Sequence, residues 1–556
     1  MNQPSRRKFL AGAGGGAAAL ALAACTSTPP NSAPGEGNTS AAAANRSGAM
    51  TNYGVGTQFK ASTPLKFSIM ILSNPVYPYN ANWLFFTQLK KMTNVSFNPT
   101  VVPFADYNTK VQTLIAAGQQ PYIIPKTYPG QEDAFVAGGQ ILPVSDYVHL
   151  MPNYQAKVAA WNLDGDLNTI RQSDGKYYLL PGLRQSVPSD YTMGVRTDLM
   201  SKYNIATPST LAQVEGMLMT LKNENPGHYP FSDRWNQPTP GGAFLQMVGN
   251  AYGTMAGWNY QSFNQGAVYD YGSKQWVFAA SMPQYQQVVT LLNGWYNKGL
   301  IDPESFTQPD TQALAKFTTG KSLAIMENAQ YVVTDQKALK PGWTVGKVPV
   351  PVGPTGATVY GPRLDAGLMI SAKAAQDPNF VAMMEFIDWL WYSDAGMLFA
   401  RWGVEGTTYS GSVADGTFSL LPNDDWAGLH PNAKIEINAT YGFYNGVFSV
   451  GGSNQLMQTQ YPPQELAFQK IMDARPPRPL NPPAPLTTLQ SQQATTTGTT
   501  LMDYVQGQTV SFITGKRPMS QWSQFQSELQ GKGSGSFLNI YAQAYTTYKA
   551  AHPTTS

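Results

Sequence analysis

The 556-residue chain is poor in charge, cysteine and histidine, and each shortage excludes a class of function. Charged residues make up 12% of the chain, about half of the usual share. Without Arg6, Arg7 and Lys8, which lie in an N-terminal signal, the chain carries 33 basic and 33 acidic residues. Nucleic acid is therefore not an expected partner, because its binding relies on a concentrated basic surface. The abundant hydroxyl, amide and aromatic groups favour a neutral polar ligand.

Cys25 is the only cysteine, so no internal disulfide can form and stability has to come from apolar burial. The four histidines are far apart and lack the spacing of a metal site: His149, His228, His430 and His552. The sequence contains no phosphate-binding loop, dinucleotide fingerprint, nucleophile elbow or zinc-protease motif. These absences predict a binding protein rather than an enzyme, with no cofactor and no metal.

Residues 1–24 have the layout of an export signal, with a basic start, a short apolar segment and a small-residue end. Arg6-Arg7 resembles a twin-arginine signal, and Leu22-Ala23-Ala24-Cys25 resembles a bacterial lipobox. The apolar run is shorter than the about 20 residues that cross a bilayer. We expect Cys25 to be lipidated and to hold the mature protein at the outer side of the cytoplasmic membrane. A cleaved signal with an incidental cysteine is the alternative.

Residues 25–62 are rich in Ser, Thr, Pro, Ala, Gly and Asn, which predicts a flexible tether. Strand-like and helix-like stretches then alternate, at residues 65–71, 83–92, 94–97, 106–117 and 121–124. This order predicts an α/β fold with right-handed crossovers and a mainly parallel sheet. The loop after Ile71 and residues 125–128 would then lie on the ligand-facing rim, beyond the carboxyl ends of the strands.

Several later segments share the order and spacing of one family: Gly175–Pro181, Val195–Leu211, Leu291–Glu304, Phe317–Ala324 and Trp402–Tyr409. In these segments the sequence resembles extracellular solute-binding proteins of ABC importers, and most of all the lipoprotein subgroup for oligosaccharide uptake (aldouronate- and alginate-type binders). Pro208, Ser209 and Thr210 supply the start of a helix over residues 211–221. Alginate-type members carry a calcium loop after this helix, but residues 224–229 lack its alternating oxygen ligands, so no structural calcium is expected.

The resemblance implies a two-lobed periplasmic-binding-protein-like fold with a ligand cleft between lobes joined by crossover segments. Lobe I is expected at residues 63–189 and 342–396, and lobe II at residues 190–341 and 397–552. The crossings would then lie near Ser189, Pro341 and Gly396. Proline-rich residues 475–500 resemble a surface strap, after which helix resumes at Leu501.

The resemblance also implies a monomer that captures an oligosaccharide by closure of its lobes and delivers it to the transmembrane subunits of an ABC permease. Two rivals remain at this point. One is a binder of another solute, such as a peptide. The other is a surface-anchored glycan-processing enzyme, in which carboxylates such as Glu405 beside Trp402 would act.

A sugar site needs aromatic faces to stack on pyranose rings and polar groups for the hydroxyls. The candidate rings are Tyr77, Tyr79, Trp83, Tyr128, Trp235, Trp258, Tyr360, Trp402 and Tyr409, with core packing as the alternative for each. Trp389 and Trp391 lie in an amphipathic run and are assigned to the core. Further candidates are Asn82 and Glu405 for hydroxyl groups, and Arg184 and Arg363 for a uronic acid carboxylate, with inter-segment ion pairs as the alternative for the arginines.

Overall fold

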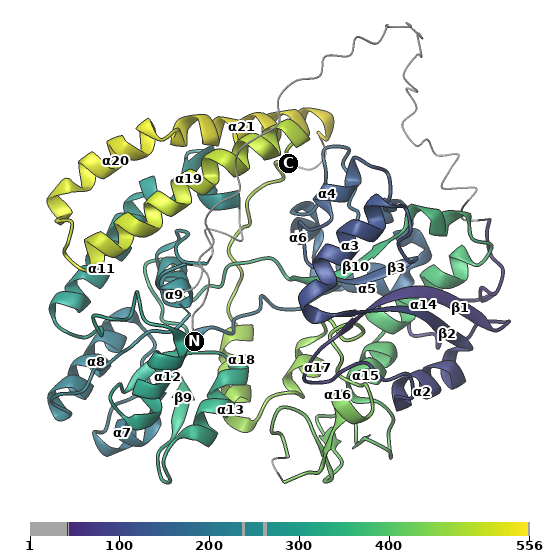
Figure 1. The fold of residues 1–556 in the computed structure, drawn as a ribbon, viewed down its shortest axis with the longest axis horizontal. Helices are drawn as coiled ribbons and strands as arrows, with labels where there is room; N and C mark the ends of the chain where they lie inside the picture. The colour runs from purple at the N-terminus through teal and green to yellow at the C-terminus, as the bar shows by residue number, and fades with distance from the viewer. Residues whose placement is uncertain (1–41, 43, 236–238, 259–263, 431, 554–556) are drawn as a thin grey trace, which may run out of the picture.

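Two α/β lobes make up the protein, and three stretches of chain connect them (Figure 1). The computed structural model describes residues 42, 44–235, 239–258, 264–430 and 432–553. Lobe I lies on the right in Figure 1 and contains the larger sheet, whereas lobe II lies on the left. The predicted two-lobed fold class is confirmed.

Lobe I is organised around a five-stranded sheet in the order β2-β1-β3-β10-β4. Its strands are β1 (Leu65–Ser73), β2 (Val95–Pro103), β3 (Ile123–Thr127), β4 (Leu180–Leu183) and β10 (Leu364–Ile370). β1 is parallel to β2 and β3, whereas β10 is antiparallel to β3 and β4. β1, β2, β3 and β4 therefore run in one direction, as the expectation of a mainly parallel sheet requires, and β10 alone runs the opposite way because the chain returns from lobe II.

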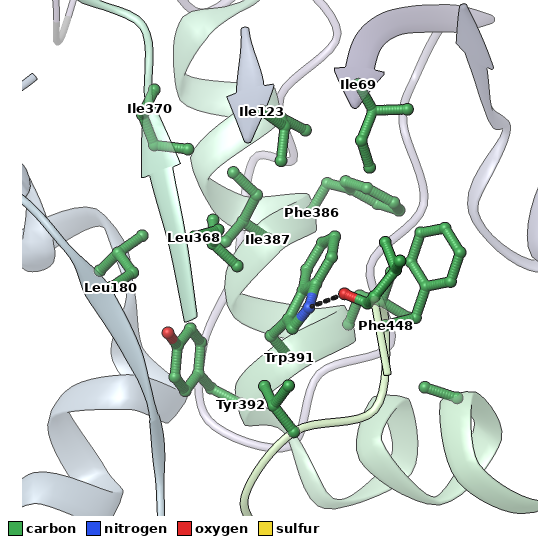
Figure 2. Packing of buried hydrophobic residues seen from close by; sticks show 14 of the residues in the cluster. Ile69, Ile123, Leu180, Leu368, Ile370, Phe386, Ile387, Trp391, Tyr392 and Phe448 are labelled. Carbon is green, nitrogen blue, oxygen red and sulfur yellow. Dashed lines mark hydrogen bonds between the residues drawn. The ribbon is translucent and has the colours of Figure 1, made fainter. Parts of the chain in front are cut away.

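The core of lobe I packs against α14 (Phe380–Tyr392), all 13 residues of which are buried. Its two acids are buried with it, and Glu385 and Asp388 accept hydrogen bonds from the Met50 backbone N–H and the Tyr53 hydroxyl at 2.9 and 2.8 Å. Phe386, Ile387 and Trp391 lie near Ile69 of β1 and Leu368 of β10 (Figure 2). The predicted assignment of both tryptophans of this helix to the core is confirmed. The other helices of lobe I are α2 (Leu84–Thr93), α3 (Tyr107–Ala116), α4 (Asp133–Val136), α5 (Pro152–Trp161), α6 (Asp164–Asn168), α15 (Asp394–Trp402), α16 (Ile437–Thr440) and α17 (Asn454–Gln458).

Residues 44–62 are folded against lobe I and correct the predicted extent of the tether. The Phe59 ring is fully buried and contacts Tyr53 and Phe386, with centroids 6.1 and 5.9 Å apart. The Tyr53 hydroxyl donates a hydrogen bond to Asp388 at 2.8 Å. These two aromatic residues supply apolar surface that the surrounding small polar residues lack, so the segment can order. The signal and Cys25 lie outside the described residues.

Residues 397–458 pack with lobe I, in contrast to the expectation that they belong to lobe II. Phe399 and Phe448 stack on Phe85 of α2, with ring centroids 5.3 and 4.4 Å apart. The Trp391 indole N–H donates to the Val447 carbonyl at 3.3 Å, which ties this segment to α14 (Figure 2). The predicted boundary is wrong because these aromatic contacts join residues that are hundreds of positions apart.

Lobe II contains an antiparallel sheet in the order β8-β5-β9, made of β5 (Thr192–Arg196), β8 (Ala324–Glu327) and β9 (Val345–Lys347). Ala324 and Met326 belong to one core, and Ile325 between them belongs to another, as the alternation of strand side chains requires. Both faces of the sheet are thus covered. The helices are α7 (Thr197–Lys202), α8 (Leu211–Glu224), α9 (Gly242–Tyr252), α11 (Pro283–Asn297), α12 (Asp310–Thr319) and α13 (Ala329–Ala338). A capping box of Thr210 and Gln213 starts α8, which confirms the predicted helix start.

The chain ends in α19 (Thr488–Ile513), α20 (Trp522–Gly531) and α21 (Ser534–Ala551), the yellow-green and yellow helices at the top of Figure 1. A capping box of Thr487 and Gln490 starts α19, well before the predicted helix start at Leu501. The Thr/Gln-rich first turns are helical because α19 runs along lobe II and buries Ala494 and Leu501 in its core. The predicted strap therefore ends earlier than residue 500.

The chain crosses between the lobes at residues 184–191, 348–363 and 459–487, and the third stretch contains α18 (Pro463–Asp473). Ser189 lies within the first crossing, and Pro341 still lies in lobe II, before β9. The crossing predicted at Gly396 is wrong, because this glycine lies where α15 packs on α14. A Cβ at Gly396 would lie 1.9 Å from the Trp389 carbonyl oxygen.

Short elements complete the described part of the chain. The strands are β6 (Ala267–Asp270), β7 (Gln275–Phe278), β11 (Tyr409–Ser410), β12 (Ser419–Leu420), β13 (Asp424–Asp425) and β14 (Ile435–Glu436). The short 3-10 helices are η1 (Phe104–Asp106), η2 (Val144–Asp146), η3 (Val148–Leu150), η4 (Asn264–Gly266), η5 (Ala279–Ser281), η6 (Ala372–Gln376) and η7 (Met519–Gln521). Among the described residues, no helix has both the length and the apolar character needed to span a membrane.

Candidate ligand-binding site

Four aromatic rings gather on lobe II where the first crossing enters it. Tyr191 contacts Trp235 and Trp258 edge to face, with centroids 5.2 and 5.1 Å apart, and Trp235 contacts Tyr331 at 5.6 Å. Tyr191 and Tyr331 keep 37% and 36% of their surface exposed. We call these four residues the lobe II aromatic cluster. Partly exposed rings of this kind can stack on the C–H-rich faces of sugars.

Arg234 supports the lobe II aromatic cluster from the interior of the lobe. Its guanidinium lies 4.4 Å from the ring centroid of Trp235 and 4.5 Å from that of Tyr331. The side chain is buried and forms ion pairs with Glu327 and Asp335. Burial raises the pKa of Glu327 well above its usual range, and Arg234 opposes that rise. A planar guanidinium held by two carboxylates has a fixed orientation, so it fixes the two rings that it touches.

Trp235 has an unusual backbone conformation, with a φ of 62° in the left-handed region. Bulky residues rarely adopt this conformation, and it persists only where the surrounding structure enforces it. The Trp235 backbone N–H donates to the Asp310 carboxylate at 2.8 Å, which anchors the strained residue to the first turn of α12. The indole is therefore preorganised by its backbone as well as by Arg234.

A pocket of about 130 Å³ opens on lobe I at the carboxyl ends of β1 and β3. Its lining consists of Leu72, Asn74, Tyr77, Phe104, Lys126, Tyr128, Asn445, Gly446 and Val447. We call it the lobe I pocket. Phe104 and Tyr128 are 57% and 47% exposed, so this rim also offers aromatic surface. Burial raises the pKa of Tyr77, and the ammonium of Lys126 partly offsets that rise.

The first crossing leads from lobe I to the lobe II aromatic cluster. It starts at Arg184, which pairs with Asp365 of β10 at 2.6 Å, and it ends at Tyr191. Burial acts to raise the pKa of Asp365, but Arg184 and its hydrogen bonds outweigh burial and hold this pKa below its usual value. A stretch of this length spans at most about 28 Å when fully extended.

Three of the predicted ligand contacts belong to the core of lobe I. Trp83 and Trp402 are 1% and 0% exposed, and their indole N–H groups donate to Ala439 and Thr459 at 2.9 and 2.7 Å. Tyr409 is also buried, and its ring packs on Phe418 at 5.4 Å. These predictions are corrected, because rings without an exposed face cannot stack on a ligand.

The two arginines proposed as carboxylate clamps are occupied by acidic residues of the protein. Arg184 pairs with Asp365, and Arg363 donates to Asp166 from Nε and Nη2 at 3.1 and 2.7 Å. The alternative of inter-segment ion pairs thus describes both of them. Tyr360, in the second crossing, lies under the Arg478 guanidinium, which is 4.8 Å from the Tyr360 ring centroid.

The remaining predicted residues lie near the chain surface. Asn82 is exposed in a turn in which its N–H donates to the Asn80 side chain at 2.9 Å. Glu405 is exposed in the turn after α15. Tyr79 is half-buried and packs on Trp83, with centroids 5.8 Å apart. The structure brings none of these three into the lobe I pocket or the lobe II aromatic cluster.

Four predicted residues do lie on these two surfaces: Tyr77 and Tyr128 in the lobe I pocket, and Trp235 and Trp258 in the lobe II aromatic cluster. Their roles remain predictions. Sequence reasoning missed Tyr191, Tyr331, Lys126 and Asn445. Lys126 could have been found, because residues 125–128 were assigned to the ligand-facing rim. Asn445 carried no such signal, because its segment was assigned to the wrong lobe.

Metal-binding groups are sparse in the described part of the chain. No group of three or more His, Cys, Asp and Glu side chains is arranged to hold a metal ion there. Asp164, Asp166 and Asn168, which alternate in sequence, lie in α6, and Asp166 is held by Arg363.

Two α/β lobes joined by three crossings define the class of two-lobed, periplasmic-binding-protein-like folds. The sequence comparison then identifies the family. Residues 79–395 match the profile of the bacterial extracellular solute-binding proteins, and the chain belongs to this family. Membership in a family of binding proteins agrees with the expectation of binding rather than catalysis.

Individual relatives are distant. Lipoprotein LipO of Bacillus subtilis (strain 168) is 21% identical over 359 residues, which cover 62% of this chain and 68% of LipO. The Streptococcus pneumoniae ABC-transporter substrate-binding protein FusA, solved in complex with kestose, is similar with a TM-score of 0.61 and 18% identity, over 87% of this chain and 100% of that chain. An extracellular solute-binding protein from Bifidobacterium longum subsp. infantis gives a TM-score of 0.64 and 14% identity, over 88% and 99% of the two chains. At these identities the structural likeness establishes the fold.

Proposed function

We propose that this protein is the substrate-binding lipoprotein of an ABC transporter and captures an oligosaccharide between its lobes. The lobe II aromatic cluster carries the proposal. It combines two partly exposed tyrosines with an indole that is held by a strained backbone and a buried arginine. Such preorganised rings lower the cost of stacking on a sugar. The similarity of the fold to FusA, which was solved with kestose, supports a carbohydrate ligand.

Capture would proceed by closure of the two lobes about the three crossings. A ligand that touches both the lobe I pocket and the lobe II aromatic cluster favours the closed state, because only that state offers both sets of contacts. The closed form would then dock on the transmembrane subunits of a permease and release the sugar to them. We therefore expect an oligosaccharide that bridges the two surfaces to favour closure more than a single sugar ring that contacts one of them.

Attachment to the membrane would follow from the N-terminal residues. Cys25 would carry the lipid, and the residues up to about position 44 would link it to the folded lobes. Replacing Arg6-Arg7 with Lys-Lys should leave the precursor in the cytoplasm, as fractionation and immunoblotting would show. Continued export of that variant would indicate the general secretion route. Cys25→Ser should release the protein from the membrane fraction.

Ligand binding can be tested by thermal shift across neutral and acidic oligosaccharides and peptides, followed by calorimetry. A ligand at ~100 times its dissociation constant should add about 2.7 kcal/mol to the free energy of unfolding. Tyr191→Ala and Tyr331→Ala should each weaken sugar binding by about tenfold, because each removes a stacking face. Tyr229→Ala removes a lobe II tyrosine of similar exposure, 39%, that lies outside the cluster, and should not change affinity. A shift with peptides and with no sugar would refute the carbohydrate proposal.

A further inference from the structure

Lys126 has a backbone conformation that its place in a strand does not explain. It lies in β3 with a φ of 60°, in the left-handed region that favours glycine. Gly367 of β10 pairs with Thr127, while the next residue, Leu368, pairs with Pro125, so Lys126 is the extra residue of a β-bulge. Bulges redirect side chains and are enriched next to binding sites. Here the bulge lies where β3 meets the lobe I pocket.

The bulge places the Lys126 ammonium over the loop after Tyr444. A Cβ on Gly446 would lie 3.1 Å from Lys126 Nζ, so the ammonium rests against this glycine. The ammonium also lies 5.4 Å from the ring centroid of Tyr128. No acidic oxygen of the described residues forms an ion pair with Lys126. An ammonium that lies in a strained bulge and forms no ion pair is available to a ligand.

Asn445 adds a second hydrogen-bond donor to the same pocket. Its side-chain oxygen accepts from the Val447 N–H at 3.0 Å, which turns the NH₂ group away from the backbone. That NH₂ group is buried and has no hydrogen-bond partner in the described part of the chain. A buried donor without a partner is costly and marks a place where a ligand oxygen could complete the hydrogen bonding. The tie between Trp391 and Val447 keeps this loop in place (Figure 2).

Lys126 is the charged residue in the lining of the pocket. The nearby acid Asp365 is already paired with Arg184, and its low pKa owes a smaller part to Lys126. The pocket lining thus carries one ammonium and no carboxylate, which favours an anionic ligand group over a neutral hydroxyl.

We infer that the lobe I pocket is a subsite for a negatively charged substituent of the bound oligosaccharide, a carboxylate or a sulfate, held by Lys126 and Asn445. The inference rests on the proposed sugar-binding function and adds the charge of the ligand to it. Tyr77 and Tyr128 flank the anion and pack against the ring that carries it. The anionic sugar residue occupies the lobe I pocket, and the neutral residues of the oligosaccharide extend to the lobe II aromatic cluster.

The test uses the purified full-length mature protein and sugars that differ in charge alone or nearly so. Calorimetry would compare lactose with lactose sulfate, and galactobiose with digalacturonate. We expect the acidic members to bind on the order of 10- to 100-fold more tightly than their neutral parents, as for hydrogen bonds to charged groups. Added salt should reduce this preference, because it screens the ammonium. The sulfate and carboxylate arms identify the favoured anion.

Two substitutions of one residue test the role of Lys126. Lys126→Met and Lys126→Gly should each abolish the preference for acidic sugars. Glycine adopts the left-handed conformation without strain, so Lys126→Gly should melt no lower than the wild-type protein and rules out misfolding as the cause. Lys66→Met removes the same charge from the opposite end of the neighbouring strand β1, where Lys66 is exposed, and should keep the preference.

The outcomes separate the inference from the function on which it rests. If neutral sugars bind as tightly as acidic ones, or if the Lys126 variants keep the preference, the anionic subsite is refuted while sugar binding stands. If no sugar of either kind binds, the proposed function fails and the subsite fails with it. A preference for acidic sugars that only the Lys126 variants lose, and that Lys66→Met retains, supports the inference.

Discussion

The three crossings meet at one buried lysine, and its removal should weaken the whole hinge. Lys347, at the end of β9, contacts Glu465 of α18 at 2.8 Å and Asp190 of the first crossing at 3.1 Å. The side chains of Lys347 and Glu465 are 2% and 1% exposed, whereas Asp190 is 39% exposed. The Lys347 ammonium also lies 3.9 Å from the ring centroid of Phe468. One side chain thus links all three connections between the lobes.

Lys347→Met should lower the free energy of unfolding by about 3–5 kcal/mol, the usual cost of leaving one partner of a buried ion pair uncompensated. Burial already raises the pKa of Glu465, and Lys347 opposes that rise. Without the lysine this pKa should rise further, and the folded variant should hold a proton that the unfolded chain releases. Stability of the variant should therefore fall as pH rises from the unfolded pKa of about 4.3 towards the raised folded pKa.

Urea denaturation at pH 5 and pH 8 would measure this effect, with a larger deficit expected at pH 8. The double variant Lys347→Met with Glu465→Gln removes both charges and should be more stable than Lys347→Met alone at pH 8. Lys298→Met is the control, because its pair with Glu215 is exposed, at 52% and 24%, and should contribute at most about 1 kcal/mol. The reasoning fails if Lys347→Met costs no more than Lys298→Met, or if the double variant is the least stable.

Three further changes test the assignments of buried groups. Burial raises the pKa of Glu132 to about 8 from 4.5, so the free energy of unfolding should fall by at most about 5 kcal/mol as pH rises through that range. Glu132→Gln should reduce this dependence of stability on pH, as thermal denaturation at several pH values would show. Trp402→Phe should lower stability by about 1–3 kcal/mol and leave sugar affinity unchanged, because the indole lies in the core; reduced affinity in the folded variant would contradict its placement. Arg363→Ala should lower the free energy of unfolding by about 3–5 kcal/mol, because it leaves Asp166 without its ion-pair partner. Calorimetry should show unchanged sugar affinity; a loss of affinity would indicate that Arg363 contacts the ligand.

Local patterns in the sequence were sufficient for several elements of the fold. The alternation of strands and helices up to β3 predicted the parallel part of the lobe I sheet, since each element there pairs with a neighbour in sequence. The start of α8 was predictable because its cap is formed within four residues. The amphipathic run of α14 likewise predicted that Trp389 and Trp391 lie in the core. In each case the determining contacts are close in the chain or follow from composition.

Long-range contacts decided the rest, and they also decide the candidate site. Tyr53 and Phe59 fold back on α14 across more than 300 positions, so composition predicted a tether where the structure has ordered chain. Residues 397–458 join lobe I through stacking of Phe448 on Phe85, and this placement brings Asn445 to the lobe I pocket.

The sequence by itself determined the family, the two-lobed class and the rim on which Tyr77, Lys126 and Tyr128 lie. Family motifs and the order of strands and loops depend on residues that are close together in the chain. Only the tertiary structure decided which polar and aromatic groups remain free for a ligand. Arg184 is paired with Asp365 of β10, whereas Lys126 lies in a bulge at the lobe I pocket and forms no ion pair among the described residues. Whether a side chain meets a partner depends on residues brought together by folding, and spacing along the chain does not record that.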